Sequence, residues 1–137
     1  MKGIQNIRLS LPSHPRFLSV IRMAISQVAR GMTFNEEEVK NIALAVDEAC
    51  TNVIKYAYQG KHDKEIILTA TVKRDRLVVT IRDFGKKSNP ESFKSRPLKK
   101  VRPGGLGLYF IKKIMDEVKY DTSSKLGTTL RLVKYKK

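Results

Sequence analysis

The spacing of apolar positions changes within the first third of the chain. Residues 7–11 alternate apolar and polar side chains, which is the two-residue period of a strand with one buried face. Apolar residues then recur every three to four positions until Gly31. This spacing predicts a first helix that Ser13 caps and that has Pro15 in its first turn.

The helical spacing returns in the next segment and is followed by strand-like runs. Asn35 and Glu38 stand at capping-box spacing at the start of a second helix, and Gly60 marks its end. Two β-rich runs, at residues 66–72 and 77–82, are separated by a short polar turn. We therefore expect a helix followed by a β-hairpin.

The remaining segment begins with a stretch that has no period. Residues 86–103 hold three prolines and seven basic residues against one acid, which is typical of a functional loop such as a lid. A helix is expected at about 106–118, with strands at about 119–123 and 128–134. About three helices and five strands, mostly joined by hairpins, predict an α+β fold, a two-layer sandwich.

The composition limits the class of protein. The chain has 137 residues, a length that suits a single domain spanning 1–137. No apolar run is long enough to cross a membrane, and the N-terminus lacks the apolar stretch of a signal peptide. Cys50 is the one cysteine and lies on an apolar helix face, so we expect a buried thiol and a cytoplasmic protein.

Charge is the most conspicuous feature of the composition. The formal net charge of +15 suggests an anionic partner, which could be a nucleic acid, a phosphorylated ligand, an acidic protein or a membrane surface. Charge alone does not choose among them, and a merely soluble basic surface explains it as well.

A polar stripe runs along the second expected helix. At about 100° per residue, Glu48, Asn52 and Lys55 fall on one side and the apolar residues on the other. The simpler interpretation is a solvated helix face. The alternative is a carboxylate, a carboxamide and an ammonium group on the wall of a cleft.

Two glycine-containing motifs follow. Asp83 and Gly85 stand directly after an expected strand, where a carboxylate can accept a hydrogen bond from a flat ligand. Taken alone, an ordinary Asp turn is the better interpretation of these residues. Gly104, Gly105 and Gly107 open the third helix, where exposed backbone N–H groups attract anions. A flexible loop or tight packing would also account for these glycines.

Taken together and in this order, the motifs resemble those of the GHKL, or Bergerat-fold, ATPase superfamily of gyrases, heat-shock chaperones, mismatch-repair proteins and histidine kinases. Residues 47–58, DEACTNVIKYAY, are similar to its helix motif, and residues 83–85 to its Asp-x-Gly box. Residues 104–108 resemble the second glycine box and residues 127–129 the closing Gly-Thr pair. The resemblance implies a mixed, mostly antiparallel sheet with about three helices on one face.

The short chain is most similar to the stand-alone branch of that superfamily, the anti-sigma factor serine/threonine-protein kinases. The resemblance implies that Glu48 is the catalytic carboxylate, that Asn52 binds Mg²⁺ and that Asp83 accepts a hydrogen bond from adenine. The implied contacts to ATP are Asn52, Lys55, Asp83, Gly85, Gly104, Gly105, Gly107, Leu108, Thr128 and Thr129.

The chain departs from the family pattern just after Gly85. Lys87 stands where many relatives have a second glycine, and Ser88 and Asn89 replace an aromatic and an acidic residue found in related anti-sigma kinases. The departure concerns the shape of the adenine pocket and leaves the pair of Glu48 and Asn52 intact.

The resemblance therefore implies an ATP-dependent protein serine/threonine kinase that acts as an anti-sigma factor in a partner-switching system. Its partners would be a sigma factor, an antagonist protein phosphorylated on serine, and a second copy in a homodimer. The alternative is a catalytically weak ATP- or ADP-binding module that regulates a protein partner. Direct nucleic-acid binding rests on charge alone, because aromatic residues are few and no recognition motif is present.

Overall fold

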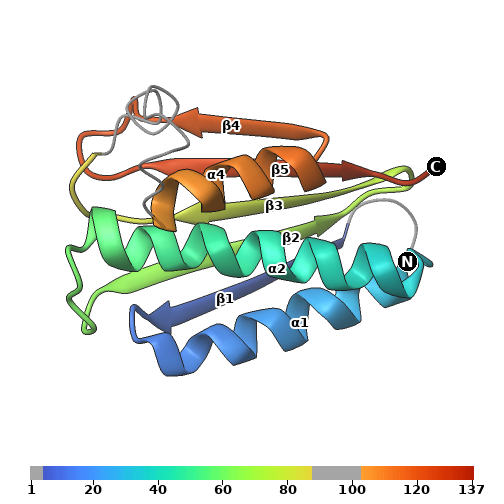
Figure 1. Ribbon diagram of the computed structural model, residues 1–137, viewed down its shortest axis with the longest axis horizontal. Helices are drawn as coiled ribbons and strands as arrows, with labels where there is room; N and C mark the ends of the chain where they lie inside the picture. The colour runs from blue at the N-terminus through green and yellow to red at the C-terminus, as the bar shows by residue number, and fades with distance from the viewer. Residues whose placement is uncertain (1–4, 88–102) are drawn as a thin grey trace.

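The computed structural model describes residues 5–87 and 103–137, with side chains from residue 107 onwards in the second range. It has two layers, an antiparallel five-stranded sheet and a layer of helices on one face of that sheet (Figure 1). The strand order is β1-β2-β3-β5-β4, and every described pair is antiparallel. The strands are β1 Gln5–Pro12, β2 Glu65–Val72, β3 Arg76–Arg82, β4 Glu117–Asp121 and β5 Thr129–Tyr135. The expected α+β two-layer sandwich is confirmed.

The helical layer consists of α1, α2 and α4. The helices are α1 Leu18–Gly31, α2 Glu36–Asn52 and α4 Pro103–Ile114, with a 3₁₀ turn η1 at Pro15–Phe17 and a π-helical turn η2 at Val53–Ala57. In Figure 1, α2 lies between the other two helices. None of the helices in the described residues is long and apolar enough to cross a membrane.

The capping box that begins α2 is confirmed. The Glu38 N–H donates to Asn35 Oδ1 at 2.8 Å, and the Asn35 N–H donates to Glu38 Oε1 at 3.1 Å. The predicted cap of the first helix is wrong in detail. His14 caps η1 through Nδ1, whereas the buried Ser13 donates its hydroxyl to the Lys61 carbonyl at 2.6 Å. The hydroxyl of Ser13 thus connects the end of β1 with the loop before β2.

The helix expected at about 106–118 begins and ends earlier than the sequence indicated. It spans Pro103–Ile114, and the residues from Glu117 belong to β4. Val118 pairs with Leu132, and the Asp116 N–H donates to the Val133 carbonyl at 2.8 Å. These hydrogen bonds across to β5 stabilise strand geometry in residues that would also fit the apolar face of a longer helix.

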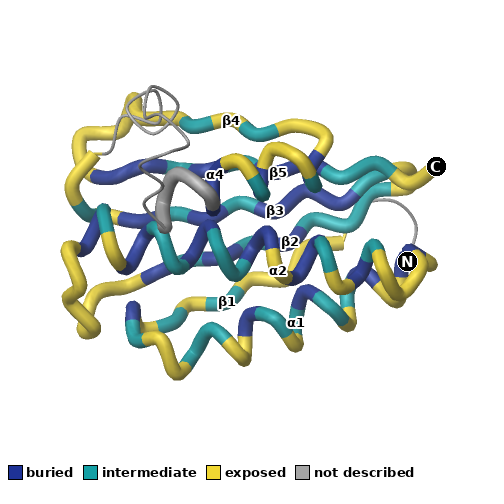
Figure 2. The backbone as a smooth tube through the Cα atoms, viewed as in Figure 1, coloured by how far each residue is buried: buried dark blue, intermediate teal, exposed yellow. Residues whose placement is uncertain are grey.

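The core lies between the sheet and the helices. Figure 2 shows the buried stretches on β2, β3 and β5 and on the sides of the helices that face them. Cys50 lies in this core with no exposed area, as expected, and burial raises the pKa of its thiol well above the usual range. In η2, the Tyr58 N–H donates to the carbonyl of Val53 at 2.9 Å, five residues back. The wider turn takes the chain from α2 towards β2 with Ile54 and Ala57 still buried.

Candidate active site

The carboxyl-terminal half of α2 faces the start of α4. A Cβ placed on Gly107 would overlap the Glu48 carboxylate, with Glu48 Cδ at 3.1 Å and Asn52 Nδ2 at 3.6 Å from that position. Because Gly107 has no side chain, α4 approaches α2 this closely without displacing the end of Glu48. Glu48 and Asn52 are both partly buried, so this part of the polar stripe is not a freely solvated helix face.

The environment of Glu48 suits a proton acceptor. Burial raises the pKa of its carboxyl group, Lys55 lowers it, and the neighbouring Asp47 raises it again. Burial is the largest of these influences. Lys55 is exposed one helical turn beyond Asn52, so its ammonium group can approach a ligand from the helix side. A carboxylate with a raised pKa accepts a proton more readily than an exposed one.

Asp83 lies at the other end of the site and is held by the backbone around it. It follows β3 and is only 4% exposed. The Asp83 N–H donates to the Thr128 carbonyl at 3.0 Å, and the Gly85 N–H donates to Asp83 Oδ1 at 3.0 Å. Burial raises the pKa of the Asp83 carboxyl group, and the backbone amides of Gly85 and Thr128 partly offset this.

Gly85 and Gly127 allow backbone segments to approach each other closely around Asp83. A Cβ on Gly85 would lie 2.7 Å from the carbonyl carbon of Ala57 and 2.8 Å from Tyr58 Cδ1. Gly127 has a φ of +72°, and a Cβ there would overlap the Asp83 carbonyl and lie 2.7 Å from Phe84 Cα. Gly85 therefore has a packing role against η2, beside any contact that it makes with a ligand.

Tyr58 connects three segments around Asp83. Its hydroxyl accepts a hydrogen bond from the Phe84 N–H at 2.9 Å and donates to the Glu65 carbonyl at the start of β2. Burial raises the pKa of this hydroxyl. Tyr58 ends the helix motif, but the motif does not predict its two hydrogen bonds, because their partners lie outside it, 7 and 26 residues along the chain.

A pocket brings residues of both ends together. Asn52 of α2, Asp83 after β3 and Thr128 before β5 line it. The other lining residues are Ala49, Val53, Tyr56, Ala57, Tyr120 and Leu130. Sequence reasoning missed the two tyrosines. The alternation in residues 117–121 was a signal for Tyr120, whose burial raises the pKa of its hydroxyl to about 12.

Some of the remaining predicted contact residues lie at the site and others do not. Gly104 and Gly105 belong to the first turn of α4, where helix-start N–H groups have no partner within the helix, and Leu108 is buried. Thr129 does not line the pocket, because it pairs with Arg82 and Asp121 on the other face of the sheet. The predicted lid at 86–103 lies outside the described residues, apart from its ends.

The beginning of that loop is hydrogen-bonded to η2 and to the turn after β4. The Lys86 N–H donates to the Ala57 carbonyl at 2.8 Å, and Lys87 Nζ donates to the Thr122 carbonyl at 2.7 Å. Lys87, which replaces a glycine of the family pattern, thus connects the chain after Asp83 with the turn that follows β4.

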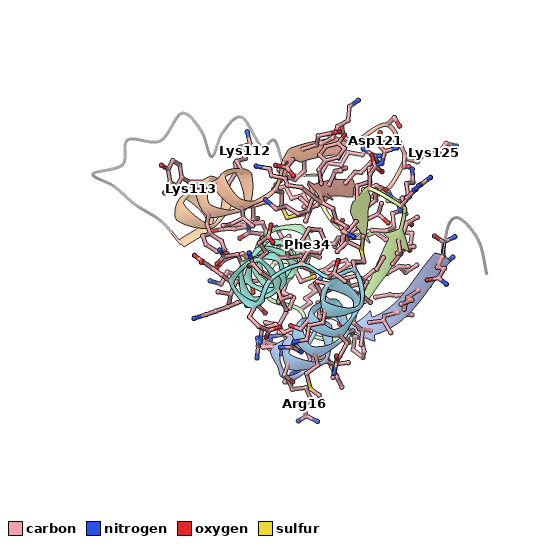
Figure 3. All side chains as sticks on the ribbon, turned by 90° about the vertical axis from the view of Figure 1, so that its right-hand side faces the viewer. Arg16, Phe34, Lys112, Lys113, Asp121 and Lys125 are labelled. Carbon is pink, nitrogen blue, oxygen red and sulfur yellow. The ribbon has the colours of Figure 1, made fainter. Side chains whose placement is uncertain are left out.

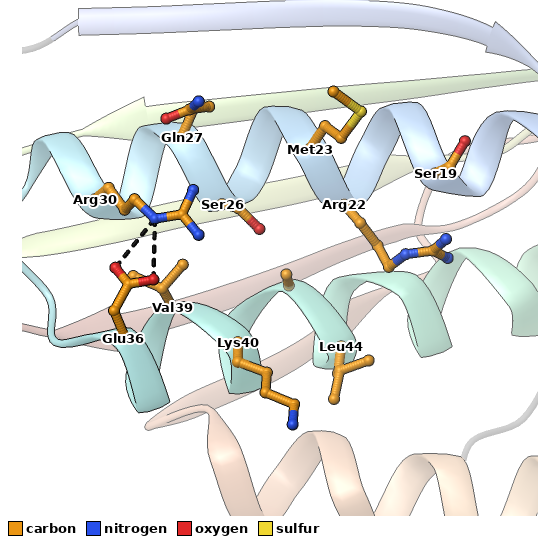
Figure 4. A pocket seen from close by; sticks show the side chains of 11 residues that line it. Ser19, Arg22, Met23, Ser26, Gln27, Arg30, Glu36, Val39, Lys40 and Leu44 are labelled. Atoms are coloured by element: carbon orange, nitrogen blue, oxygen red, sulfur yellow. Dashed lines mark hydrogen bonds and ion pairs between the residues drawn. The ribbon is translucent and has the colours of Figure 1, made fainter.

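A second hollow lies between α1 and α2, away from the residues of the motifs (Figure 4). Its wall includes the ion pair of Arg30 with Glu36 at 3.0 Å. Arg22 also lines it and pairs at 3.0 Å with Asp47, which lies outside the wall. The exposed side chains of Met23 and Lys40 also line it. None of the predicted nucleotide contacts belongs to this groove.

Comparisons with known proteins agree with this geometry. The histidine kinase-like ATPase domain family matches residues 11–134. Serine-protein kinase RsbW of Bacillus pumilus is 33% identical over 139 residues, covering 94% of this chain and 85% of that protein. RsbW of Listeria monocytogenes serovar 1/2a is also 33% identical, with 94% of this chain and 86% of that protein covered.

Solved structures show the same fold at lower identity. The structure of the SiaB–SiaC complex from Pseudomonas aeruginosa matches with a TM-score of 0.71 and 14% identity, covering 93% of this chain and 88% of the matched chain. The RsbU and RsbW domains of Rv1364c from Mycobacterium tuberculosis match with a TM-score of 0.69 and 14% identity, covering 95% and 31%. The chain therefore belongs to the histidine kinase-like ATPase domain family and is a relative of the serine-protein kinases RsbW.

Proposed function

We propose that this chain is an ATP-dependent protein serine kinase that acts as an anti-sigma factor in a partner-switching system. The proposal treats residues 1–137 as one ATP-binding kinase domain. The observation that carries it is the meeting of Glu48 and Asn52 with Gly107, while Asn52 shares a pocket with Asp83. The similarity to serine-protein kinases over most of the chain supports the choice of serine as acceptor.

The two ends of the candidate site would hold different parts of ATP. Asp83 and Thr128 would bind the adenine, with the Asp83 carboxylate accepting from the exocyclic amine. Gly104, Gly105 and Gly107 would offer backbone N–H groups at the start of α4 to the phosphates. The absence of a side chain at Gly107 places the backbone of α4 directly beside the carboxylate of Glu48 and near the carboxamide of Asn52.

Asn52 is our candidate ligand for a magnesium ion that accompanies ATP. A carboxamide oxygen suits a hard cation whose remaining ligands are phosphate and water oxygens. When bound, the ion would neutralise charge on the phosphates. Lys55 would contribute a second positive charge from the exposed end of the helix motif.

Transfer of the γ-phosphoryl group to serine requires one proton acceptor from this chain. The serine oxygen of the substrate protein forms a bond to the γ-phosphorus as the bond between that phosphorus and the leaving oxygen of ADP breaks. Glu48 would orient the serine hydroxyl and accept its proton. Burial beside α4 raises the pKa of Glu48, which favours this role.

The proposed protein partners are a sigma factor and a small antagonist that carries the acceptor serine, with a homodimer as the functional form in the cytoplasm. They follow from the resemblance to stand-alone anti-sigma kinases. A related structure, SiaB, was solved in complex with SiaC, which supports a fold that binds a protein partner.

The test measures transfer of ³²P from γ-labelled ATP to the cognate antagonist. We expect Glu48→Gln to lower transfer by about 10²- to 10⁴-fold, because it removes the proton acceptor, while ATP affinity stays within about threefold. Glu37→Gln, an exposed glutamate in the first turn of the same helix, is the matched control. Unchanged transfer by Glu48→Gln would disprove the role of Glu48.

The same assay decides between kinase and binding module. Lys87 in place of a family glycine, hydrogen-bonded to Thr122, is the observation that favours a module with weak catalysis. ATP binding by the wild type without transfer would support that alternative.

Calorimetry with Asn52→Ala, with and without Mg²⁺, tests the metal ligand, because only the magnesium-dependent part of the ATP affinity should be lost.

A further inference from the structure

One row of side chains crosses all five strands on the face of the sheet that carries no described helix. Strand pairing places Arg8 opposite Thr69, Thr69 opposite Thr80, Thr80 opposite Arg131, and Arg131 opposite Lys119. Directly opposed residues in neighbouring strands lie on the same face of a sheet. We call these five residues the basic row. It contains three cations, two hydroxyl groups and no carboxylate.

The basic row is accessible. Arg8 and Lys119 are exposed, and the Arg131 side chain is 40% exposed. Figure 3 looks along the layers and shows α4 with Lys112 and Lys113 on one side, while Asp121 and Lys125 lie beside the sheet on the other. A ligand on this face would therefore approach from the side opposite the helices.

Neighbouring residues on the same face carry charges of both signs. Arg82 and Arg76 of β3 add two cations, whereas Glu65 of β2 and Glu117 and Asp121 of β4 supply three carboxylates. With the three cations of the basic row, the strands present five cations and three anions on this face. The Arg131–Glu117 ion pair is long, at 3.6 Å, so it leaves much of the Arg131 charge available.

The helical layer has no net charge by the same count. Helices α1, α2 and α4 together carry five basic residues and five acidic ones. Their arginines are paired, with the Arg22–Asp47 and Arg30–Glu36 ion pairs both at 3.0 Å. The open sheet face is therefore more positive than the helical layer, and a face with net positive charge attracts a partner of opposite charge.

The chemistry of the face selects among anionic partners. A second copy of this chain in a symmetric contact would place arginines against arginines, which is repulsive. Bases of a nucleic acid would need bare aromatic rings, but the guanidinium of Arg82 lies 4.6 Å from the Phe84 ring centroid and that of Arg76 lies 5.8 Å from the Tyr135 ring centroid. A flat sheet also offers no element that could enter a groove of duplex DNA.

We infer that the open sheet face, centred on Arg8, Arg131 and Lys119, binds the acidic surface of a protein partner. Carboxylates can pair with the cations of the row, and the Thr69 and Thr80 hydroxyls between Arg8 and Arg131 can donate further hydrogen bonds. The face is on the other side of the sheet from the pocket of Asn52 and Asp83, so a protein bound here would leave the nucleotide pocket open. The inference stands apart from the proposed kinase activity.

The test compares two variants of equal net charge. The sheet variant is Arg8→Gln, Lys119→Gln, Arg131→Gln, and the control is Arg16→Gln, Lys40→Gln, Lys113→Gln, which changes three exposed cations outside the sheet face. Binding of fluorescein-labelled poly-L-glutamate is measured by anisotropy at low salt. We expect the sheet variant to bind at least tenfold more weakly than wild type and the control to stay within threefold.

Equal weakening in both variants would overturn the inference, because total charge would then explain the binding. It would also be overturned if oligo(dT) or phosphatidylserine vesicles bound more tightly than polyglutamate and lost binding only in the sheet variant. If the triple variant does not fold, Arg8→Gln and Lys119→Gln alone should each weaken binding by about two- to threefold. Magnesium–ATP affinity, measured in the same samples, should not change, which separates this result from any failure of the proposed kinase function.

Discussion

The two ends of the candidate site differ in the groups that pack together there. At the base end, around Asp83, a side chain added to Gly85 or Gly127 would meet backbone atoms of Ala57 or Asp83. At the phosphate end, a side chain added to Gly107 would meet the terminal carboxylate of Glu48. The base end is thus closed by backbone against backbone, and the phosphate end by side chains.

The difference between backbone and side-chain packing suits the two proposed tasks, which are holding the base and transferring the phosphoryl group. Backbone contacts move only if a strand or turn moves, so the base end is fixed once the sheet has formed. A glutamate side chain can change rotamer without disturbing the fold, so the phosphate end can adjust as a substrate hydroxyl approaches. We therefore expect substitutions at the base end to act mainly on stability and affinity, and those at the phosphate end mainly on rate.

The largest effect is expected at Gly127. Gly127→Ala should lower the free energy of unfolding by about 2–4 kcal/mol, because the residue has a φ of +72° and its Cβ would meet the Asp83 backbone. Gly60 is a matched control, since its φ is +81° but nothing lies within 4 Å of a Cβ there. Gly60→Ala should cost about 1 kcal/mol. Urea unfolding followed by circular dichroism measures both, and equal losses would mean that backbone crowding at Asp83 is unimportant.

At the phosphate end, Gly107→Ala should separate rate from stability. The added methyl group displaces the Glu48 carboxylate, and a displacement of about 1 Å lowers a rate by about 100-fold. The free energy of unfolding should fall by less than about 1 kcal/mol, because the flexible end of Glu48 can move aside. Gly31→Ala, with no atom within 4 Å of the new methyl group, should leave phosphotransfer unchanged. If Gly107→Ala lost as much stability as Gly127→Ala, the two ends of the site would not differ in the way proposed.

A smaller effect is expected from Asp83→Asn. The variant keeps the shape of the side chain but removes the negative charge from an acceptor, so ATP affinity should fall by about 10-fold or somewhat more. Asp63→Asn, an exposed aspartate in the loop before β2, is the control. Calorimetry with ATP provides the measurement. An affinity equal to that of wild type would show that Asp83 does not hold the base.

The smallest effect concerns the pH dependence of stability without nucleotide. Burial raises the pKa of Glu48 above its ordinary value of 4.5, so the folded chain holds this proton to a higher pH than the unfolded chain. Stability from this group therefore falls as the pH rises from about 4.5 through the raised pKa.

Glu48→Gln lacks this titration. It should be slightly more stable than wild type at pH 7, by less than about 0.5 kcal/mol because Glu48 is partly solvated, and the difference should vanish near pH 4. Thermal unfolding across this range measures it. A difference that grows towards low pH would contradict the raised pKa.

Local patterns were enough for most of the elements but not for their ends. The capping box at Asn35 was predictable because its two hydrogen bonds join residues three apart. The end of α4 was not, because Val118 fits a helix face equally well and only its pairing with Leu132 selects the strand. The cap at Ser13 failed for the same reason, since its hydroxyl bonds to Lys61, far along the chain.

For the site, the sequence by itself determined which chemical groups are present and in what order: the carboxylate and carboxamide one turn apart on α2, the Asp-x-Gly turn, and the glycines that open α4. Only the tertiary structure decided which of them meet. Gly107 packs against Glu48, and Asp83 and Asn52 line one pocket together with Tyr120. Thr129 lies on the other face of the sheet. The physical reason is that spacing along one helix or strand fixes the direction of a side chain, whereas contact between elements depends on long-range packing and hydrogen bonds.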